Sequence, residues 1–431
     1  MILHLNLLEL NMTIRMYDVH FGDCFLLKEE NECLLVDFGS IDSKFNFEDV
    51  ANNISTQIQG KEFSVLLTHF HQDHMNGLWK LTNFPSTNTI KRFYLPSVVC
   101  MNEKGEMKYS FLQVSVISDF LQSLVLHKGT PEITVYSLLL SLIEKKTRVR
   151  FLERGDIFTC DQTKYEVLWP ASEDLKVDSR ICVSLDKLLS GERKIGLELD
   201  LINCLIRKIF ECYETMSSAN FLIYDNQIRE LERAYTDVAH MYEFIKANLS
   251  IENSKWIKAR VKTMRNQANK WSIVFHTKSN HEASHNMLHY LGLEGSLGKF
   301  HEDIHTAIAN EKVILMTGDA TKAVLNKIIK NTRIQPSIPL HECYSILKAQ
   351  HHGTKTHFVT KIPAAKQILI SNGKCNGRED RKISHEWSHV AHLQSGSIAC
   401  TDKDFCECSV LSNGYTPCAG CPNTSNSYTD F

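Results

Sequence analysis

The sequence predicts an α/β sandwich that is interrupted by a helical insertion. Strand-like runs fill residues 1–171 and 269–399, where they alternate with a few helices, whereas residues 172–268 have helical periodicity almost throughout. Residues 400–431 form a cysteine-rich tail. The chain has 431 residues, of which 43% are hydrophobic and 23% charged, so it has the size and composition of a globular protein with a large core.

The first part begins with a predicted β-hairpin. Residues 13–40 alternate apolar and polar side chains and turn at the polar segment KEENE. The elements expected next are strands at 63–70 and 89–99, helices at 109–127 and 133–146, and a strand, a Gly-Asp turn and a second strand over 148–171.

The insertion is expected to contain long helices with one apolar side. Residues 195–216 form one of them, and residues 228–245 carry apolar side chains at three- and four-residue steps. This second pattern predicts one buried stripe, made of Ile228, Leu231, Tyr235, Val238, Tyr242 and Ile245. After the insertion, strands are expected within residues 270–278, 312–320, 344–353, 365–373 and 395–404.

A cluster of histidines follows the apolar run that begins at residue 63. The segment THFHQDH places His69, His71, Asp73 and His74 within six residues. Because side chains alternate along a strand, His69 and His71 are expected to point the same way, with Asp73 and His74 on a turn that begins a helix. Imidazole and carboxylate are ligands of zinc, and two-metal hydrolytic sites hold their ions about 3.5–4 Å apart. Four ligands cannot complete two coordination spheres, so others must come from elsewhere.

Candidate ligands follow strands of the second part. Asp319 ends the run VILMTG, His351 and His352 end ILKAQ, and His385 follows a strand and a loop. Several strand ends that finish in metal-ligand types are the pattern expected of a dinuclear centre at a sheet edge. The alternatives are that Asp319 is a turn residue and that His352 supports a ligand without binding metal itself.

These segments resemble a known family. THFHQDH matches the HxHxDH signature of the metallo-β-lactamase superfamily, and LLVDFGS matches the strand-end aspartate motif that precedes it. More narrowly, the chain is similar to the metallo-hydrolase domain of the bacterial competence DNA-uptake channel protein and its soluble relatives. Matching segments run in the expected order from residue 13 to about 410, outside the insertion and the tail. They include YDVHFGDCFLL, RGDIFTCDQTKYEVLWP, NKWSIVF, LMTGDA, LKAQHHGT, ISNGKCNG, SHEW and SIACTDKDF.

The resemblance implies an αββα sandwich with a dinuclear metal centre. His69 and His71 would bind the first ion, Asp73 and His74 the second, and Asp319 would bridge both. Zinc is the expected metal, while manganese and iron also accept mixed histidine and carboxylate sites. A hydroxide that bridges the ions would attack the substrate, and Asp73 would orient it as a catalytic residue.

The remaining ligands and supporting residues are also taken from the resemblance. His351 or His352, together with His385, would complete the two spheres, and we favour His351 with His352 in a supporting contact. The family's histidine before the GDA strand is replaced here by the segment NKWS, so that Asn269 and Ser272 would lie beside the metals.

Other residues near the motif are assigned supporting roles. Asp37, in LLVDFGS, is expected to hold the histidine loop by accepting hydrogen bonds from backbone amides. His20 and Asp23 are expected to form a tight turn near the site. The six histidines between His276 and His305 have irregular spacing and are interpreted as solvated loop residues rather than ligands.

The chain has 14 cysteines, and most are scattered. These are expected to be reduced and buried. In the tail, Cys406 and Cys408 form one close pair and Cys418 and Cys421 another, so the two pairs could surround a structural zinc ion. Idle thiols are an equally good interpretation, since C-x-C is less typical of zinc sites than C-x-x-C.

A basic stripe lies near the end of the insertion. Lys255, Lys258, Lys262 and Arg265 recur at three- and four-residue steps without an intervening acid. A solvated helix face is the default interpretation. The alternative is a surface that contacts substrate phosphates, because the stripe leads directly into the NKWS segment.

The expected function is metal-dependent hydrolysis of a phosphodiester in nucleic acid or a nucleotide. Alternatives are hydrolysis of a lactone, ester or amide, or a non-catalytic subunit whose helical insertion binds another protein or a second copy. The net charge of -2 does not by itself indicate a nucleic-acid or membrane partner. The first dozen residues are too short to span a bilayer and lack a basic leader, so a cytoplasmic location is expected.

Overall fold

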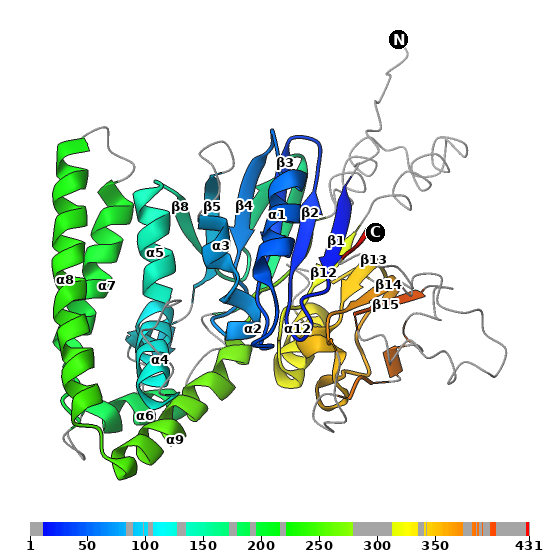
Figure 1. Cartoon of the computed structure of the whole chain (residues 1–431). Helices are drawn as coiled ribbons and strands as arrows, with labels where there is room; N and C mark the ends of the chain where they lie inside the picture. The colour runs from blue at the N-terminus through cyan, green and yellow to red at the C-terminus, as the bar shows by residue number, and fades with distance from the viewer. Residues whose placement is uncertain are drawn as a thin grey trace, which may run out of the picture.

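The computed structural model contains two seven-stranded mixed sheets, shown in Figure 1. It describes residues 12–82, 89–97, 99–101, 107–126, 135–171, 179–189, 195–215, 221–278, 313–334, 340–341, 343–373, 382–384, 386–387, 390, 397–401 and 428–430. The first sheet contains, in spatial order, β16 (Tyr428–Asp430), β1 (Thr13–Tyr17), β2 (Phe25–Lys28), β3 (Glu32–Val36), β4 (Glu62–Leu66), β5 (Ile90–Pro96) and β8 (Arg148–Leu152). The second contains β15 (Ser397–Cys400), β14 (Ala364–Ile370), β13 (Cys343–Lys348), β12 (Ile314–Met316), β11 (Val274–Thr277), β10 (Thr163–Trp169) and β9 (Ile157–Cys160).

Both sheets follow the same plan. From β16 to β3 the first sheet is antiparallel, and from β3 to β8 it is parallel. The second sheet is antiparallel from β9 to β12 and parallel from β12 to β15. The sequence predicted these strands except β16, which lies in the segment expected to be a cysteine-rich tail. The first predicted hairpin and the predicted strand pair over 148–171 each contain three strands. Parallel neighbours bring several strand ends to one edge of each sheet, and the candidate ligands follow those ends.

Apolar side chains of the two sheets form a shared core. Tyr94 of β5 and Phe158 of β9 are both buried, and their ring centroids lie 5.1 Å apart across the interface between the sheets. On the outer face of the first sheet, α1 (Phe47–Gln57) contributes Ile54 to a second core. On the outer face of the second sheet, α12 (Lys322–Ile334) contributes Ile328 to a third. Helices therefore cover the face that each sheet turns away from the other.

A block of helices extends from one end of the first sheet, beyond β8 (Figure 1). α4 (Phe111–Leu126) and α5 (Val135–Glu144) precede residue 172, where the sequence predicted that the insertion begins. Both nevertheless pack against helices of the insertion: α4 packs against α7, α8 and α9, and α5 packs against α7. The helical block therefore joins residues from both sides of the expected boundary at residue 172. Its members are α4 (Phe111–Leu126), α5 (Val135–Glu144), α6 (Ser179–Leu189), α7 (Leu199–Thr215), α8 (Phe221–Ala247) and α9 (Ile251–Ala268).

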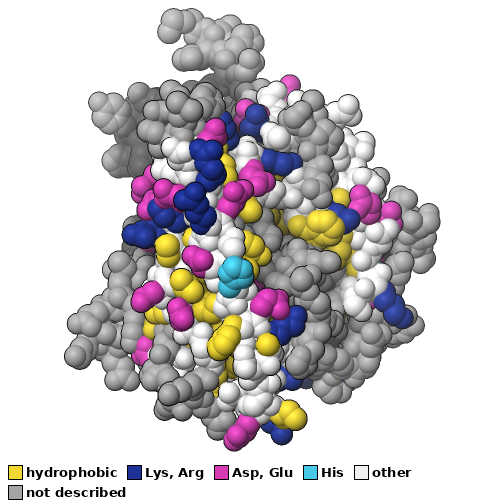
Figure 2. Space-filling model, turned by 60° about the vertical axis from the view of Figure 1, so that its left-hand side comes forward, with side chains coloured by type: hydrophobic (Ala, Val, Ile, Leu, Met, Phe, Trp, Pro, Cys, Tyr) yellow, Lys and Arg dark blue, Asp and Glu magenta, His cyan; other side chains and the backbone are white. Residues whose placement is uncertain are grey.

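The apolar stripe predicted on α8 is largely confirmed. Leu231, Val238 and Ile245 are buried, but Tyr235 is 36% exposed and Ala234 lies in the buried face instead. Figure 2 shows the side of the molecule on which the block lies, where basic, acidic and hydrophobic side chains intermingle. None of the described helices combines the length and the apolar character that crossing a bilayer requires.

Candidate metal centre

The histidine cluster lies in the loop after β4 and in the short helix α2 (Gln72–Met75). β4 ends at Leu66, so the expectation that a strand continues to residue 70 was wrong, and strand alternation does not orient His69 and His71. The two rings are nevertheless neighbours, with centroids 4.6 Å apart. Asp73 and His74 lie in α2, as the sequence predicted.

Glycine allows the loop after β3 to approach this cluster closely. A Cβ atom on Gly39 would lie 2.4 Å from both the carbonyl carbon of Asp73 and the backbone nitrogen of His74. In that loop, the backbone nitrogen of Phe38 donates to the carbonyl oxygen of His74 at 2.8 Å. The backbone nitrogen of Asp23 donates to the carbonyl oxygen of Asp73 at 2.9 Å. These backbone contacts hold the histidine loop in place, and a side chain on residue 39 would block them.

Asp37, which is buried directly after β3, orients two of the imidazoles. Its Oδ1 accepts a hydrogen bond from the backbone nitrogen of Thr68, and its Oδ2 accepts from Thr68 Oγ1 and His74 Nδ1, all at 2.7 Å. Because the Thr68 hydroxyl donates to this carboxylate, it accepts from His69 Nδ1, which lies 3.1 Å away. The neutral forms of His69 and His74 therefore carry hydrogen on Nδ1 and keep the Nε2 lone pair free.

Two further imidazoles are oriented by backbone carbonyls. His71 Nε2 donates to the carbonyl oxygen of Arg265 at 2.8 Å, which leaves Nδ1 with the lone pair. His352 Nδ1 donates to the carbonyl oxygen of Ser371 at 2.8 Å, which leaves Nε2 with the lone pair in the neutral form. A carbonyl oxygen can only accept, so the tautomer is decided in both cases. Metal-binding histidines are typically held in this way, with one nitrogen bonded to the protein and the other free.

Four ligand atoms lie together as those of a single metal site do. His74 Nε2 lies 3.3 Å from Asp319 Oδ2, while His352 Nε2 lies 3.5 Å from that oxygen and 3.4 Å from Asp73 Oδ2. A zinc ion with tetrahedral ligands at about 2.1 Å holds the ligand atoms about 3.4 Å apart. The four atoms lie within 4.8 Å of one another, so this buried group could hold a metal ion.

His351 lies at the edge of this group. Its Nδ1 is 3.3 Å from Asp319 Oδ2 but also 2.9 Å from Asn269 Nδ2, and its ring stacks on His357 with centroids 3.7 Å apart. The His351 side chain is 24% exposed, whereas that of His352 is 1% exposed. The geometry favours His352 as the ligand of the four-atom group, which reverses the preference drawn from the sequence.

Backbone strain occurs at these two histidines. His351 and His352 have φ angles of 46° and 57°, a conformation that costs roughly 1–3 kcal/mol per residue unless glycine adopts it. Contacts to the turn after β12 hold the strained segment: the backbone nitrogen of His351 donates to the carbonyl oxygen of Gly318 at 3.2 Å. In that turn, Ser272 Oγ accepts from the backbone nitrogen of Asp319 at 2.9 Å. Ser272 and Asn269 therefore each contact a candidate ligand, in agreement with the place that the family resemblance implied for them.

The centre contains more buried carboxylates than buried lysine or arginine side chains among the described residues. Asp23, Asp37, Asp73 and Asp319 are each at most 9% exposed. Among the described residues, Lys348 is the only lysine or arginine paired with them, with Nζ 2.5 Å from Asp23 Oδ2 and 3.5 Å from Asp319 Oδ1. Four carboxylates minus one ammonium leaves three negative charges. Isolated buried charges are very unfavourable, so protons on the imidazoles or bound cations must supply the balance.

Lys348 was missed by the sequence analysis, although the sequence contains a signal for it. It ends β13 among apolar residues and is 0% exposed. Lysine is almost never fully buried unless it is paired, so a lone lysine at the end of an apolar strand indicates a buried anion nearby. Asp23, its partner, also lies 3.2 Å from His352 Nδ1, which confirms the expected place of Asp23 beside the site. His20, by contrast, lies at the surface and pairs with Asp42.

The carboxylates raise the pKa of two imidazoles. Burial favours the neutral form of His352, but Asp319 and Asp23 outweigh it and raise the pKa of His352 to about 10. Burial acts in the same direction on His74, where Asp319 and Asp37 outweigh it and raise the pKa well above its usual value. These two imidazoles therefore carry protons at neutral pH when no metal ion is bound.

The other two imidazoles of the motif stay neutral. Burial, together with the charge of His74, holds the pKa of His69 well below its usual value. Burial is also the main reason that the pKa of His71 falls to about 4, with the nearby Arg265 charge acting in the same direction. Both lone pairs are consequently available to a metal ion at neutral pH without the loss of a proton.

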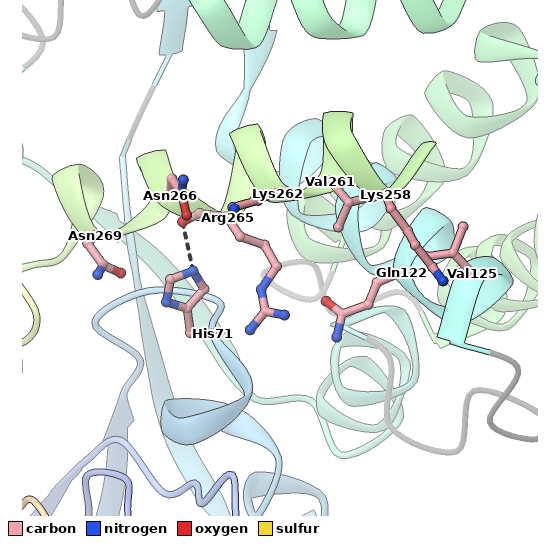
Figure 3. A pocket seen from close by; sticks show the side chains of 9 residues that line it. All are labelled: His71, Gln122, Val125, Lys258, Val261, Lys262, Arg265, Asn266 and Asn269. Carbon is pink, nitrogen blue, oxygen red and sulfur yellow. Dashed lines mark hydrogen bonds between the residues drawn. The ribbon is translucent and has the colours of Figure 1, made fainter. Parts of the chain in front are cut away.

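A cavity of about 330 Å³ opens beside His71 (Figure 3). α9 lines it with Lys258, Lys262 and Arg265, so three cations of the predicted stripe face the neighbourhood of the metal ligands. Lys255, the first cation of that stripe, is exposed and does not line the cavity. The remaining lining residues are Gln122, Val125, Val261, Asn266 and Asn269.

Several candidates lie outside the described residues. They are His385, the tail cysteines Cys406, Cys408, Cys418 and Cys421, and five of the six histidines between positions 276 and 305. The sixth, His276, was wrongly interpreted as a solvated loop residue, because it is buried on β11 with Nδ1 2.9 Å from the Tyr344 hydroxyl. Of the eight cysteines whose side chains the structure describes, six are buried, as expected.

Comparison with known proteins assigns the chain to no family, because neither a family model nor a curated protein matches it. The interpretation of the centre therefore depends on its own chemistry. That chemistry comprises four oriented imidazoles, four buried carboxylates and one buried lysine, brought together from loops that are distant in the sequence.

Proposed function

We propose that the protein is a hydrolase that uses two divalent metal ions, zinc or manganese, to cleave phosphodiesters. We also propose that it belongs to the metallo-β-lactamase superfamily, whose signature the histidine motif resembles and whose αββα layering agrees with two packed sheets covered by helices. One observation carries the proposal. Atoms of Asp73, His74, Asp319 and His352 converge from three separate segments of the chain at the spacing of a tetrahedral metal site.

The second ion is proposed from the ligand atoms that the first leaves over. His69 Nε2 is buried and has no hydrogen-bond partner among the described residues. The His69 ring lies 4.2 Å from that of His74 and 4.6 Å from that of His71, whose Nδ1 is also free. Asp319, which lies among the imidazoles, is the carboxylate that two ions would share.

Divalent ions bound here would supply ionised water at neutral pH and neutralise the charge that develops on a phosphate during hydrolysis. The chain's own residues prepare the site. Asp37 and Thr68 hold the imidazoles in the metal-binding tautomer, and Asp73 can orient an attacking water by accepting its hydrogen bond. The cavity beside His71 favours phosphodiesters over lactones, because cations rather than a purely apolar surface line it.

The proposal is tested with a substrate panel. Purified protein is assayed with zinc, with manganese and with a chelator against bis(p-nitrophenyl) phosphate, single- and double-stranded DNA, RNA and a set of lactones. We expect metal-dependent phosphodiester cleavage that His71→Ala abolishes and that His240→Ala, an exposed histidine on α8, leaves unchanged. Lactone turnover without phosphodiester cleavage would replace the proposed substrate class, and a fully active His71→Ala protein would refute the ligand assignment.

A further inference from the structure

We propose that the cavity beside His71 is a binding subsite for a second phosphate group of the substrate, next to the phosphodiester that is cleaved. The inference rests on the proposed function in one respect, since that function places the scissile phosphate at the metal ligands. The cavity lies between α9 and α4, so the helical block rather than the sheets supplies most of the subsite (Figure 3).

The geometry of α9 directs its cations into the cavity. Ser254, Ile257, Val261, Met264 and Ala268 form the buried face of the helix at three- and four-residue steps. Lys258, Lys262 and Arg265 each follow a buried residue, so they form a parallel stripe on the adjacent side. At about 1.5 Å of rise per residue, the stripe extends about 10 Å along the helix towards His71.

These three cations have no acidic partner in the described part of the chain. Lys258 and Lys262 are exposed, and Arg265 is half-buried. Elsewhere in the block a lysine is neutralised, since Lys208 of α7 pairs with both Glu211 and Glu230. Three unpaired positive charges around one cavity attract an anion, and phosphate oxygens accept hydrogen bonds from lysine and arginine.

Polar groups on the other walls complete the subsite. Gln122 of α4 is 8% exposed and forms no hydrogen bond with the described residues. Asn269 Oδ1, at the end nearest His351, is likewise buried without a partner. Buried amides without partners are unfavourable, so a bound ligand that uses them would be stabilised.

The lining also defines what is bound. Among the described residues, no phenylalanine, tyrosine or tryptophan lines the cavity, and its one aromatic ring, that of His71, is held by Arg265, so no large ring is offered on which a base could stack. Its volume of about 330 Å³ is at the lower end of the range for ligand pockets, roughly 300–1,000 Å³. The subsite therefore suits a phosphate with its immediate linker, and it recognises the phosphate rather than the base.

Arg265 connects the subsite to the metal centre. Its side chain lines the cavity, while its carbonyl oxygen accepts the hydrogen bond from His71 Nε2 at 2.8 Å. Arg265 would thus bind the second phosphate through its side chain, and it orients the candidate ligand His71 through its backbone.

The test measures binding separately from cleavage. The probes are fluorescent dithymidines that carry a methylene-phosphonate linkage, which cannot be hydrolysed, with and without a 5′-phosphate. We expect the 5′-phosphate to tighten binding to the full-length protein at least about tenfold at low salt. Lys262→Gln should remove most of this gain and lower the salt slope by about one. The matched control Lys255→Gln removes the same charge from the same helix outside the cavity and should keep the gain.

Further probes identify the source of the phosphate. An abasic analogue should keep the gain, since the base is not recognised. If only the 5′-phosphate tightens binding, the subsite binds a terminal phosphomonoester. If a trithymidine that lacks a 5′-phosphate binds equally tightly, the subsite binds a backbone phosphate. Both results support the subsite. Equal binding of all probes, equal losses in the Lys262 and Lys255 variants, or loss of the gain in the abasic analogue would overturn it. Absence of metal-dependent cleavage with the binding gain intact would contradict only the proposed hydrolase function.

Discussion

Replacing Thr68 with valine should weaken metal binding although Thr68 is not itself a candidate ligand. The Thr68 hydroxyl links the Asp37 carboxylate to the His69 ring, because it donates to Asp37 Oδ2 at 2.7 Å and accepts from His69 Nδ1 at 3.1 Å. It thereby sets the orientation of His69. Valine keeps the shape but removes both hydrogen bonds. Loss of such a supporting partner costs about 10–100-fold in metal affinity, which corresponds to about 1.4–2.8 kcal/mol. Loss of the bond to the Asp37 carboxylate should also lower the free energy of unfolding by about 1.5–3 kcal/mol.

The measurement is a competition titration of zinc against a chromophoric chelator, with urea unfolding of the metal-free protein in parallel. Thr68→Ser is the matched control, because serine keeps the hydroxyl and should retain zinc affinity within about threefold of wild type. If Thr68→Val binds zinc as tightly as Thr68→Ser, the hydroxyl does not set the tautomer of His69 and the argument for oriented imidazoles is refuted.

Three further predictions follow from the same contacts. Lys348→Met leaves the Asp23 carboxylate buried without its cation and should destabilise the protein by about 3–5 kcal/mol in urea unfolding. The control is Lys366→Met, at an exposed position on neighbouring β14, which should change stability by less than about 0.5 kcal/mol. Similar values for the two variants would contradict the pairing of Lys348 with Asp23. His352→Ala should lose bound metal and His351→Ala should retain most of it, as elemental analysis would measure, and the opposite result would restore the preference for His351. Because the folded-state pKa of His352 is raised to about 10 from its usual 6.5, protonation of His352 stabilises the metal-free fold fully below pH 6.5, and this contribution is lost as the pH rises through about 10. The free energy of unfolding after chelation should therefore fall across that window, and a flat profile would show that His352 is not paired with buried carboxylates.

The sequence predicted which residues meet at the centre better than it predicted how they meet. Asp37 and His74 follow the parallel strands β3 and β4 of the first sheet, so their meeting could be anticipated. Asp319 and His352 follow the parallel strands β12 and β13 of the second sheet, so theirs could be anticipated as well. The choice between His351 and His352 could not be anticipated. It depends on two consecutive positive φ angles that aim one ring inward, and spacing along the chain does not encode that conformation.

Other features depended on contacts between distant segments. α4 and α5 were correctly predicted as helices, but only packing against α7 and α9 shows that they belong to the helical block. His276 was misplaced because it was grouped with the irregularly spaced histidines that follow it, although it lies within the strand that the sequence predicted over residues 270–278. The basic stripe of α9 was recognised, yet its contribution to a cavity beside His71 depends on where the helix ends relative to the histidine loop.

Anomalous diffraction from crystals grown with zinc tests the central claim most directly. The account predicts one peak about 2.0–2.2 Å from the facing atoms of Asp73, His74, Asp319 and His352, and a second peak beside His69 Nε2 and His71 Nδ1. Absence of a peak among these atoms at full zinc occupancy elsewhere, or rings turned away from a bound ion, would contradict the claim that these loops form a metal centre.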